Sequence, residues 1–210
     1  MPITRRLTSD LLRLLAERGD VRHLARGEVL IHEGDKSDSM FILLAGKLKV
    51  YSRDERGREV TYNELEAGEF LGEMLLDGGS RSASVKAKTA ADCLEVPARK
   101  IRTFMRAYPE FSEVLVVKLI ERLRNATTQV RSLALDGVYA RTVKLLREMA
   151  VTDEKVPYIP ASVTQGEIAS RIGATREMVN HVLRDLVRGG FLVKDEKLRL
   201  LIKKELPRQW

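Results

Sequence analysis

Two stretches of the sequence carry side chains whose types and spacing suit the recognition of anions and of nucleic-acid bases. The first is the glycine-rich segment from Gly68 to Ala83. Gly72 and Glu73 predict the start of a short helix whose free amides can meet an anion, and Arg81 can add a charge-assisted hydrogen bond. On spacing alone, a glycine-rich loop with one arginine is more often an ordinary turn with a solvated charge.

The second stretch lies near the C-terminus, where one predicted helix shows a row of hydrogen-bonding side chains. Arginine can address O6 and N7 of guanine together, and glutamate can accept from N4 of cytosine, so we expect Arg176 and Glu177 to contact base edges. A solvated helix face is the alternative. Hydroxyls and guanidinium groups suit phosphates, as expected for Thr164, Thr175, Arg184 and Arg188. The expected DNA contacts are Thr164, Thr175, Arg176, Glu177, Asn180, His181 and Arg184.

Local signals place these side chains on a pair of short helices. Thr164 and Glu167 have the spacing of a capping box, which predicts a helix that starts there and stops at Gly173. Thr175 caps a second helix. Its apolar residues recur at i, i+3, i+4 and i+7: Val179, Val182, Leu183 and Leu186. Two helices joined by a glycine turn form a helix-turn-helix pattern.

Other elements surround this helix pair. A helix at Tyr139–Met149 and a polar connection through Pro157 and Pro160 precede it. A hairpin of Phe191–Val193 and Leu198–Ile202 follows it and would form a wing.

The region from Val21 to Val96 has the pattern of short strands separated by turn signals. Its apolar segments are Glu28–His32, Met40–Ala45, Lys47–Ser52, Val60–Leu65, Ser82–Ala87 and Asp92–Val96. Alternation in Lys47–Tyr51 predicts a strand with one solvated face, as in an antiparallel sandwich or barrel. Helices are predicted at Ser9–Glu17 and Arg99–Tyr108, on either side of this region.

A long helix from Glu110 to Asp136, about 40 Å long, joins the two regions. Its apolar residues step alternately by three and four: Val116, Leu119, Leu123, Ala126, Val130 and Leu133. This heptad seam predicts pairing with a second copy of the helix, which would be both dimer interface and connecting rod. A long core helix buried within one domain is the alternative.

Composition bounds the class of protein. The formal net charge is +7; residues through Asp136 include 23 basic and 21 acidic side chains, and those after it 14 and 9. The basic excess of the C-terminal part suggests a polyanionic partner. Cys93, the single cysteine, permits no intrachain disulfide and is too little for an iron–sulfur cluster.

The sequence also bears on location and catalysis. We expect a cytoplasmic protein without a membrane partner, because no secretory signal or membrane span is predicted. The three histidines lie in different segments, and no catalytic or metal-ligating constellation is present. We therefore expect no enzymatic activity, no catalytic residue and no metal.

The two stretches resemble known motifs. The glycine-rich stretch resembles the phosphate-binding cassette of cyclic-nucleotide-binding domains. The helix pair resembles the signature Ile-x-x-x-x-Gly-x-(Ser/Thr)-Arg-Glu-x-Val of the cyclic-AMP receptor protein/fumarate-nitrate regulator (CRP/FNR) family. The matching residues are Ile168, Gly173, Thr175, Arg176, Glu177 and Val179.

This resemblance covers nearly the whole chain and implies an α+β fold. An N-terminal antiparallel β-roll, the cyclic-nucleotide-binding sensor domain, would comprise residues 1–109. A dimerisation helix would comprise residues 110–136, and a winged helix-turn-helix domain residues 137–210.

The resemblance also implies roles for single residues. Glu73 would accept a ribose 2′-hydroxyl, and Arg81 and Ser82, with amides near Gly72 and Ala83, would hold the cyclic phosphate. The expected ligand site is Leu71, Gly72, Glu73, Met74, Arg81, Ser82, Ala83, Thr127 and Thr128.

The resemblance is weaker where family members read bases. Two adjacent hydroxyl residues on the long helix approach adenine in cyclic-AMP binders, but here the first position is Ala126 and the second Thr127, unless Thr128 substitutes. Tyr62 and Asn63 stand where smaller residues would line the base. The expected allosteric ligand is therefore cyclic AMP, alternatively cyclic di-GMP or none, and no cofactor is required.

On the DNA side, His181 replaces the family's second arginine. We expect the half-site to retain a G·C pair read by Arg176 and Glu177, with the neighbouring position relaxed or altered.

The sequence thus predicts a homodimeric, ligand-modulated transcription regulator that binds a palindromic site in double-stranded DNA and contacts RNA polymerase. One alternative is a constitutive DNA binder whose pocket is vestigial or occupied by its own side chains. A further alternative is a nucleotide-binding regulatory subunit of an enzyme.

Overall fold

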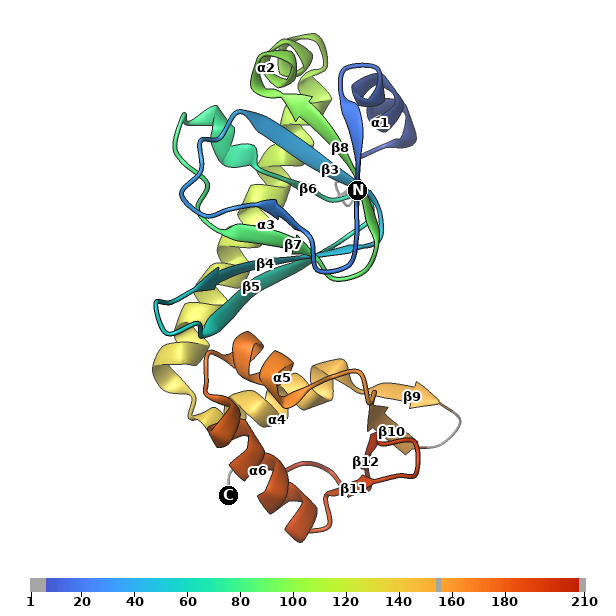
Figure 1. Ribbon diagram of the computed structural model, residues 1–210, viewed down its shortest axis with the longest axis vertical. Helices are drawn as coiled ribbons and strands as arrows, with labels where there is room; N and C mark the ends of the chain where they lie inside the picture. Colours follow the sequence, from blue (N-terminus) through green and yellow to red (C-terminus); the bar gives the residue numbers. More distant parts are fainter. Residues whose placement is uncertain (1–6, 154–155, 208–210) are drawn as a thin grey trace. The chain divides into compact units, whose positions relative to one another are not determined.

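The computed structural model describes residues 7–153 and 156–207 (Figure 1). Contacts divide the chain into two compact units. The first unit comprises the chain up to Ser52 together with Thr61–Ala126, and the second comprises Arg53–Val60 and the chain from Thr127 onwards. The long helix α3 (Pro109–Leu135) belongs to both units, as a helix that is predicted to join two regions should.

The described part of the first unit is built on two four-stranded sheets with the orders β1-β8-β3-β6 and β2-β7-β4-β5 (Figure 1). Every strand pair within β1-β8-β3-β6, and the pairs of β7 with β2 and β4, run antiparallel. The strand bounds are β1 (Asp20–Leu24), β2 (Val29–Ile31), β3 (Ser39–Ala45), β4 (Lys47–Arg53), β5 (Glu59–Glu66), β6 (Phe70–Leu71), β7 (Ser84–Ala87) and β8 (Ala91–Pro97). The predicted antiparallel β-roll is confirmed, although β1 and β6 were not anticipated.

Strand β3 is buried on both faces of its sheet over Ser39–Leu43. Met40 and Ile42 pack in a cluster with the helices of the unit, whereas Phe41 and Leu43 pack between the two sheets. Successive side chains of a strand point to opposite faces, so both sets are buried. This arrangement explains why the β3 sequence is a continuous apolar run while β4 alternates.

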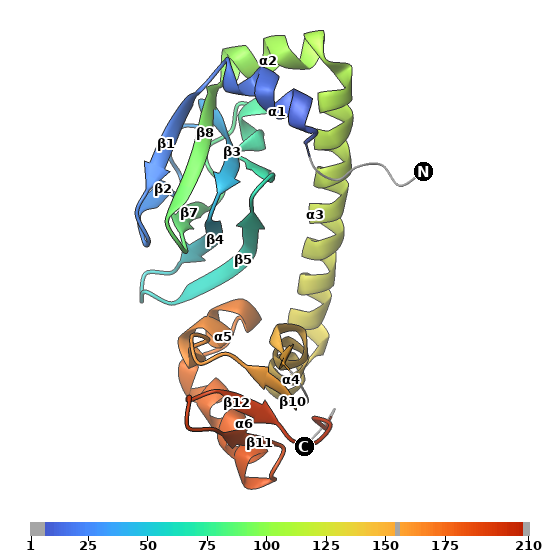
Figure 2. The same cartoon turned by 90° about the vertical axis from the view of Figure 1, so that its right-hand side faces the viewer.

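Helices α1 (Ser9–Ala16) and α2 (Ala98–Ala107) gather with the first turns of α3 at one end of the unit (Figure 2). The Phe104 ring of α2 meets the Phe111 ring of α3 edge-on, with centroids 5.2 Å apart. This apolar cluster holds the start of α3 against the β-roll, and its contacts identify that part of the helix as core. Only beyond it does α3 expose its apolar side chains.

The second unit packs three helices over one sheet, with strand order β11-β12-β10-β9. The elements are α4 (Val138–Met149), β9 (Val151–Asp153), β10 (Val156–Ile159), α5 (Gln165–Ile172), α6 (Arg176–Arg188), β11 (Leu192–Lys194) and β12 (Leu200–Ile202). The winged helix-turn-helix is confirmed. The polar connection expected through Pro157 contains strands that were not anticipated, because Pro157 lies in β10, which pairs with β9 and with the wing strand β12. Pairing partners distant in the sequence decided this strand against the local proline signal.

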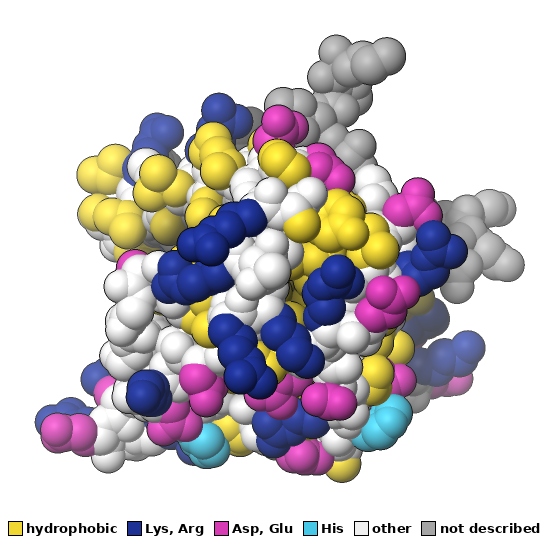
Figure 3. All heavy atoms as spheres, turned by 90° about the horizontal axis from the view of Figure 1, so that it is seen from above, with side chains coloured by type: hydrophobic (Ala, Val, Ile, Leu, Met, Phe, Trp, Pro, Cys, Tyr) yellow, Lys and Arg dark blue, Asp and Glu magenta, His cyan; other side chains and the backbone are white. Residues whose placement is uncertain are grey.

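Basic side chains are not confined to the C-terminal part. Figure 3 shows Lys and Arg side chains gathered on the face seen from above, the end at which α1 and α2 lie in Figure 1. Helix α2 contributes four basic residues and no acidic one: Arg99, Lys100, Arg102 and Arg106. The first unit is therefore nearly neutral in sum but carries a strongly positive face.

Among the described helices, none combines the length and the hydropathy that crossing a bilayer requires.

Candidate functional site

The glycine-rich stretch folds around a close approach between Gly72 and Arg81. Gly72 has φ of 82°, and it caps the short 3-10 helix η1 (Glu73–Leu76). A Cβ atom at this position would lie 2.4 Å from Nη1 of Arg81. Only glycine fits both the left-handed backbone and the passing guanidinium.

Arg81 is a buried cation held by neutral oxygens. Arg81 is only 7% exposed. Its Nη2 donates to the carbonyl oxygen of Ser39 at 2.8 Å and to the hydroxyl of Ser39 at 3.3 Å. Burial lowers the pKa of the guanidinium, an effect partly offset by Asp38 and other carboxylates. No carboxylate of the described residues lies within ion-pair distance of it. A buried charge without a counter-charge is costly, so the position favours an anion.

Glu73 is joined to the long helix. Its carboxylate accepts from Nη1 of Arg122 at 2.8 Å, and the two side chains are only 11% and 23% exposed. Arg122 also donates to the Phe70 carbonyl, and its guanidinium lies 5.1 Å from the centroid of the Phe70 ring. The residue expected to accept a ribose hydroxyl is therefore already bound to a residue of α3.

A second ion pair repeats this connection one helical turn earlier. Lys118 of α3 lies 2.5 Å from the Glu69 carboxylate, and both side chains are 14% exposed. Burial raises the pKa of Glu69, but hydrogen bonds from Lys118 and from the Glu66 amide outweigh it, and the net shift is downwards. The sequence contained a signal for both pairs, because two acids four residues apart face two bases four residues apart. Sequence analysis missed Lys118 and Arg122.

The other expected ligand residues are placed unevenly. Leu71 is 3% exposed and its side chain packs between the sheets, so a ligand could meet this expected site residue only at its backbone. Met74 and Ser82 are exposed, and Ala83 is partly buried. Thr127 and Thr128 are exposed on α3, where the boundary between the units falls.

The helix pair of the second unit is capped as predicted. The Thr164 hydroxyl accepts from the Glu167 amide at 3.1 Å, and the Thr175 hydroxyl accepts from the Met178 amide at 3.3 Å. The Thr164 hydroxyl keeps its hydrogen, which can be donated to a phosphate. The Thr175 hydroxyl also hydrogen-bonds the Glu177 carboxylate. Both threonines therefore fix a helix start, and Thr164 keeps a free hydroxyl hydrogen for the expected phosphate contact.

The turn between the helices depends on Gly173. This residue has φ of 62°, and a Cβ atom there would lie 3.0 Å from Cδ2 of Leu133 near the end of α3. A left-handed conformation and a close neighbour both favour glycine. The family signature and the local geometry thus require the same residue for a physical reason.

Helix α6 has a buried apolar face and an exposed face that is mostly polar but includes Met178 and Val187. Its apolar residues Val179, Val182, Leu183 and Leu186 are buried. Arg176, Glu177, His181, Arg184 and Arg188 are exposed. The pKa of the Glu177 carboxyl is lowered by its own backbone amide and by the Thr175 hydroxyl, which keeps it an ionised acceptor.

Two side chains of α6 have partners that the sequence did not reveal. Asn180 accepts from Nε2 of Gln165 at 3.2 Å, so its amide oxygen links α6 to α5 in addition to the expected role at DNA. His181 lies 3.3 Å from the Asp185 carboxylate, and Arg188 lies 4.0 Å from it. Asp185 orients two residues of the exposed face and was missed.

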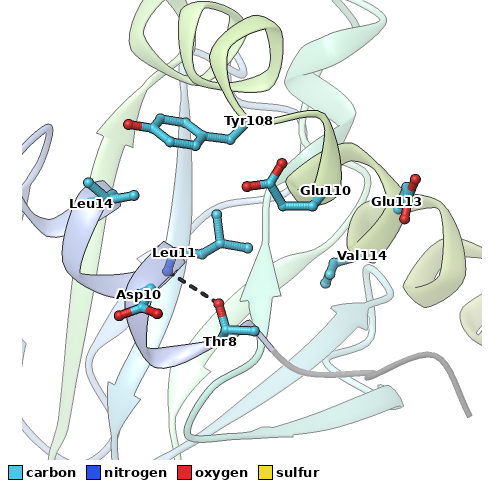
Figure 4. A pocket seen from close by; sticks show the side chains of 8 residues that line it. All are labelled: Thr8, Asp10, Leu11, Leu14, Tyr108, Glu110, Glu113 and Val114. Atoms are coloured by element: carbon cyan, nitrogen blue, oxygen red, sulfur yellow. Dashed lines mark hydrogen bonds between the residues drawn. The ribbon is translucent and has the colours of Figure 1, made fainter.

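A separate hollow of about 380 Å³ lies between α1 and the start of α3 (Figure 4). Apolar side chains meet three carboxylates there, those of Asp10, Glu110 and Glu113. A phosphate would be repelled by these charges. The hollow is therefore unsuited to a nucleotide, and the anion site remains at Arg81.

Cysteine and metal chemistry find no support in the described residues. Cys93 is buried; burial, reinforced by Asp92, raises the pKa of its thiol to about 11. The described residues contain no cluster of three or more histidine, cysteine or acidic side chains suited to a metal ion. His23, one of the three histidines, hydrogen-bonds Asp92 across the β1–β8 pair at 2.7 Å.

Three parts of the structure define the class of protein: a β-roll with a buried arginine in a glycine-rich cassette, a long helix and a winged helix-turn-helix. This is the architecture of a DNA-binding transcription regulator with a cyclic-nucleotide-binding type of sensor domain. Family models agree: residues 21–108 match the cyclic nucleotide-binding domain and residues 140–207 the Crp-like helix-turn-helix domain. The chain belongs to the CRP/FNR family of transcription regulators, whose members are not enzymes.

Curated relatives span most of the chain. The cAMP-activated global transcriptional regulator CRP of Haemophilus influenzae is 33% identical over 162 residues, which cover 75% of this chain and 72% of that protein. The cAMP-activated regulator Vfr of Pseudomonas aeruginosa is 29% identical over 188 residues, 86% of this chain and 87% of Vfr.

Solved structures show the same fold. The c-di-GMP-responsive global regulator CLP of Xanthomonas campestris superposes with a TM-score of 0.83 at 20% identity, covering 94% of this chain and all of CLP. FixK2 of Bradyrhizobium japonicum superposes with a TM-score of 0.70 at 16% identity, covering 89% of this chain and 93% of FixK2.

The Glu73–Arg122 pair should be strongly coupled. A double-mutant cycle of Glu73→Gln and Arg122→Gln, measured by urea unfolding, should give a coupling free energy of about 1–3 kcal/mol, because both side chains are largely buried. The exposed pair Lys47–Glu66, with side chains 53% and 59% exposed, is the matched control and should give less than about 1 kcal/mol. Equal couplings in the two cycles would show that burial does not strengthen the Glu73–Arg122 pair.

Proposed function

We propose that this transcription regulator is a homodimer whose DNA affinity is set by a cyclic nucleotide bound at the glycine-rich cassette. The observation that carries the proposal is a buried cation without a direct ion-pair partner, close to an acid that is bound to the long helix. Arg81 suits the cyclic phosphate, and Glu73 suits a ribose hydroxyl while it contacts Arg122 of α3. A nucleotide at this position would touch the helix that links the two units.

The proposed mechanism is a population shift. A ribose hydroxyl would compete with Arg122 for the Glu73 carboxylate, and the phosphate would supply the anion that Arg81 lacks. A ligand changes an equilibrium only through its different affinity for the two states. The nucleotide would have different affinities for the two states because it competes with Arg122 for Glu73. It would bind more tightly to the state in which the Glu73–Arg122 ion pair is weaker.

The proposed dimer uses the seam of α3. Val116, Leu123 and Val130 are 54%, 68% and 66% exposed. Leu119, Ala126 and Leu133 of the seam are exposed as well. Ile120, 46% exposed, widens the apolar stripe and was missed by the sequence analysis. Burying this stripe against a second copy removes apolar surface from water, which favours association.

For the ligand we propose cyclic AMP first and cyclic di-GMP as the alternative. The curated relatives are described as cAMP-activated, whereas CLP, whose structure is similar, is described as c-di-GMP-responsive. Ala126 removes one of the hydroxyls that approach adenine in cyclic-AMP binders. Adenine selectivity is therefore the part of the family behaviour that this chain is expected to change.

A ligand-independent regulator is the second candidate, and the same contacts favour it. Glu73 and Arg81 already bind groups of the chain itself, so the cassette keeps its shape through internal contacts. In this reading Arg122 takes the place of the ribose, and the dimer binds DNA without a nucleotide.

The proposed partners follow from the exposed faces. Two α6 helices of a dimer would read a palindromic site in double-stranded DNA, with Arg176 and Glu177 on base edges. RNA polymerase is the proposed protein partner, and the cytoplasm the proposed location.

Replacing Arg81 tests the ligand site and the ligand. The wild-type protein is titrated calorimetrically with cyclic AMP, cyclic GMP and cyclic di-GMP, and DNA binding is measured with and without each. Arg81→Ala should weaken binding of the active nucleotide by about 1.5–3 kcal/mol, because a hydrogen bond to a charged group is lost. Arg99→Ala, on the exposed surface of α2, is the control. Unchanged nucleotide affinity in Arg81→Ala would remove this residue from the site, and tight DNA binding without any nucleotide would favour the second candidate.

Replacing Arg176 tests base reading. Arg176→Ala should cost about 1–3 kcal/mol on a DNA site selected by the wild-type protein and little on random DNA, because a bidentate contact to guanine is lost. Arg188→Ala removes an expected phosphate contact and should weaken both complexes alike. An equal loss on both DNAs in Arg176→Ala would instead identify a phosphate contact.

Charge placed on the seam tests the dimer. Val130→Glu should shift the dimer towards monomer, at a cost of about 3 kcal/mol or more, because two unpaired carboxylates would be buried. Leu135→Glu is the matched control, since Leu135 is 75% exposed on α3 but lies outside the heptad seam. Sedimentation velocity distinguishes the species. A dimer that persists in Val130→Glu would place the interface elsewhere.

A further inference from the structure

The tip of the wing holds a leucine in a conformation that leucine rarely adopts. Leu198 has φ of 61°, and every other described residue with positive φ is glycine. The Leu198 amide donates to the Asp195 carbonyl at 3.0 Å, and the Asp195 amide donates to the Arg199 carbonyl at 3.0 Å. This is a tight hairpin turn whose last position is left-handed, the position that glycine or asparagine ordinarily occupies.

The surrounding contacts hold this backbone in place. The Asp195 carboxylate accepts from the Arg199 amide at 2.8 Å and from its Nε at 2.6 Å. The Arg199 guanidinium lies 4.5 Å from the centroid of the Tyr158 ring on β10. Strain of this kind persists only where neighbouring interactions over-determine the conformation, and it is concentrated at functional positions.

The strained residue also exposes its side chain. Leu198 is 60% exposed, and Val193 on β11 is 42% exposed. Lys194 and Lys197 are exposed on the same hairpin. Glu196 is exposed there too, but the cations of the hairpin, Lys194, Lys197 and Arg199, outnumber its acids, Asp195 and Glu196. An apolar tip in this setting suits a polyanion that offers an apolar surface between its charges. The deoxyribose walls of the DNA minor groove have this character, and apolar side chains of DNA-binding proteins enter that groove.

We propose that Leu198 packs against deoxyribose in the minor groove of the bound DNA, so that the wing adds an apolar contact to the reading of bases by α6. The hairpin begins directly after α6, so the wing and the expected DNA-binding helix belong to the same unit. The inference rests on DNA binding by the winged unit but not on any nucleotide. It assigns a function to the strain: the left-handed backbone presents a leucine where the residues that favour this backbone, glycine and asparagine, would present no apolar side chain.

The central test exploits opposite effects on stability and on binding. Leu198→Gly in the full-length protein should raise the midpoint of thermal unfolding of the second unit by about 3–6 °C, because the left-handed position is relieved of Cβ strain. The same variant should bind a DNA site selected by the wild-type protein about 3- to 10-fold more weakly, as expected for the loss of one apolar contact. Leu198→Asn should behave similarly.

Salt dependence separates an apolar contact from a phosphate contact. Leu198→Gly removes no charge, so the slope of log affinity against log salt concentration should stay unchanged. Lys197→Ala is the matched control, one residue away, and should lower the magnitude of that slope by about one. Hydroxyl-radical footprinting, which reports on exposed sugars, should show protected deoxyriboses in each half-site that become accessible in Leu198→Gly.

Several outcomes would overturn the proposal. A stabilised Leu198→Gly with wild-type DNA affinity would show that the strain is incidental to DNA binding. A destabilised variant would show that the leucine serves the fold. An unaltered sugar footprint would place the wing tip away from the groove. Failure of the wild-type protein itself to select a DNA site would contradict DNA binding instead, and is thereby distinguishable.

Discussion

The two ion pairs between the glycine-rich cassette and α3 are the constraint on which the first unit depends. Glu69 with Lys118, and Glu73 with Arg122, place four charges where water is largely excluded. Charges in such a position are tolerated only when they are paired. The two acids of the cassette are four residues apart, as are the two bases of α3, so pairing both sets the register of the helix against the cassette. A shift of the helix by one residue would leave buried charges unpaired. The pairs therefore couple the position of α3 to the chemistry at Glu73.

Backbone geometry supplies the second constraint, and it acts at both candidate sites. Gly72 lets the Arg81 guanidinium cross the cassette, and Gly173 lets the helix-turn-helix close beside Leu133. Leu198 is the counterexample, because it has a side chain at a left-handed position where glycine would be less strained. At the first two positions the fold requires the absence of a side chain. At the third position a side chain is present despite its cost, which is the reason for seeking its function in binding.

Charge is distributed differently from what net counts suggest. The C-terminal part has the larger excess of basic residues, in accord with a polyanionic partner. The first unit nevertheless carries the positive face of α2, because its acids lie elsewhere, several of them in ion pairs with α3 and within the sheets. The negative hollow between α1 and α3 belongs to the same unit. Short-range fields, and not net charge, decide which surface suits an anion.

The sequence by itself determined the succession of strand region, long helix and helix pair, the caps of α5 and α6 and the buried face of α6, because these depend on contacts between near neighbours and on periodicity. It also indicated Arg81 and Glu73 as candidate site residues. Only the tertiary structure decided that Pro157 lies in a strand, that Leu71 is core, and that Arg122 and Lys118 bind the cassette. Only the tertiary structure revealed that Asp185 contacts His181 and that Leu198 has a left-handed backbone. Each of these depends on where a packed or hydrogen-bonded neighbour lies or on the dihedral angles of a turn, and neither quantity is contained in local sequence pattern.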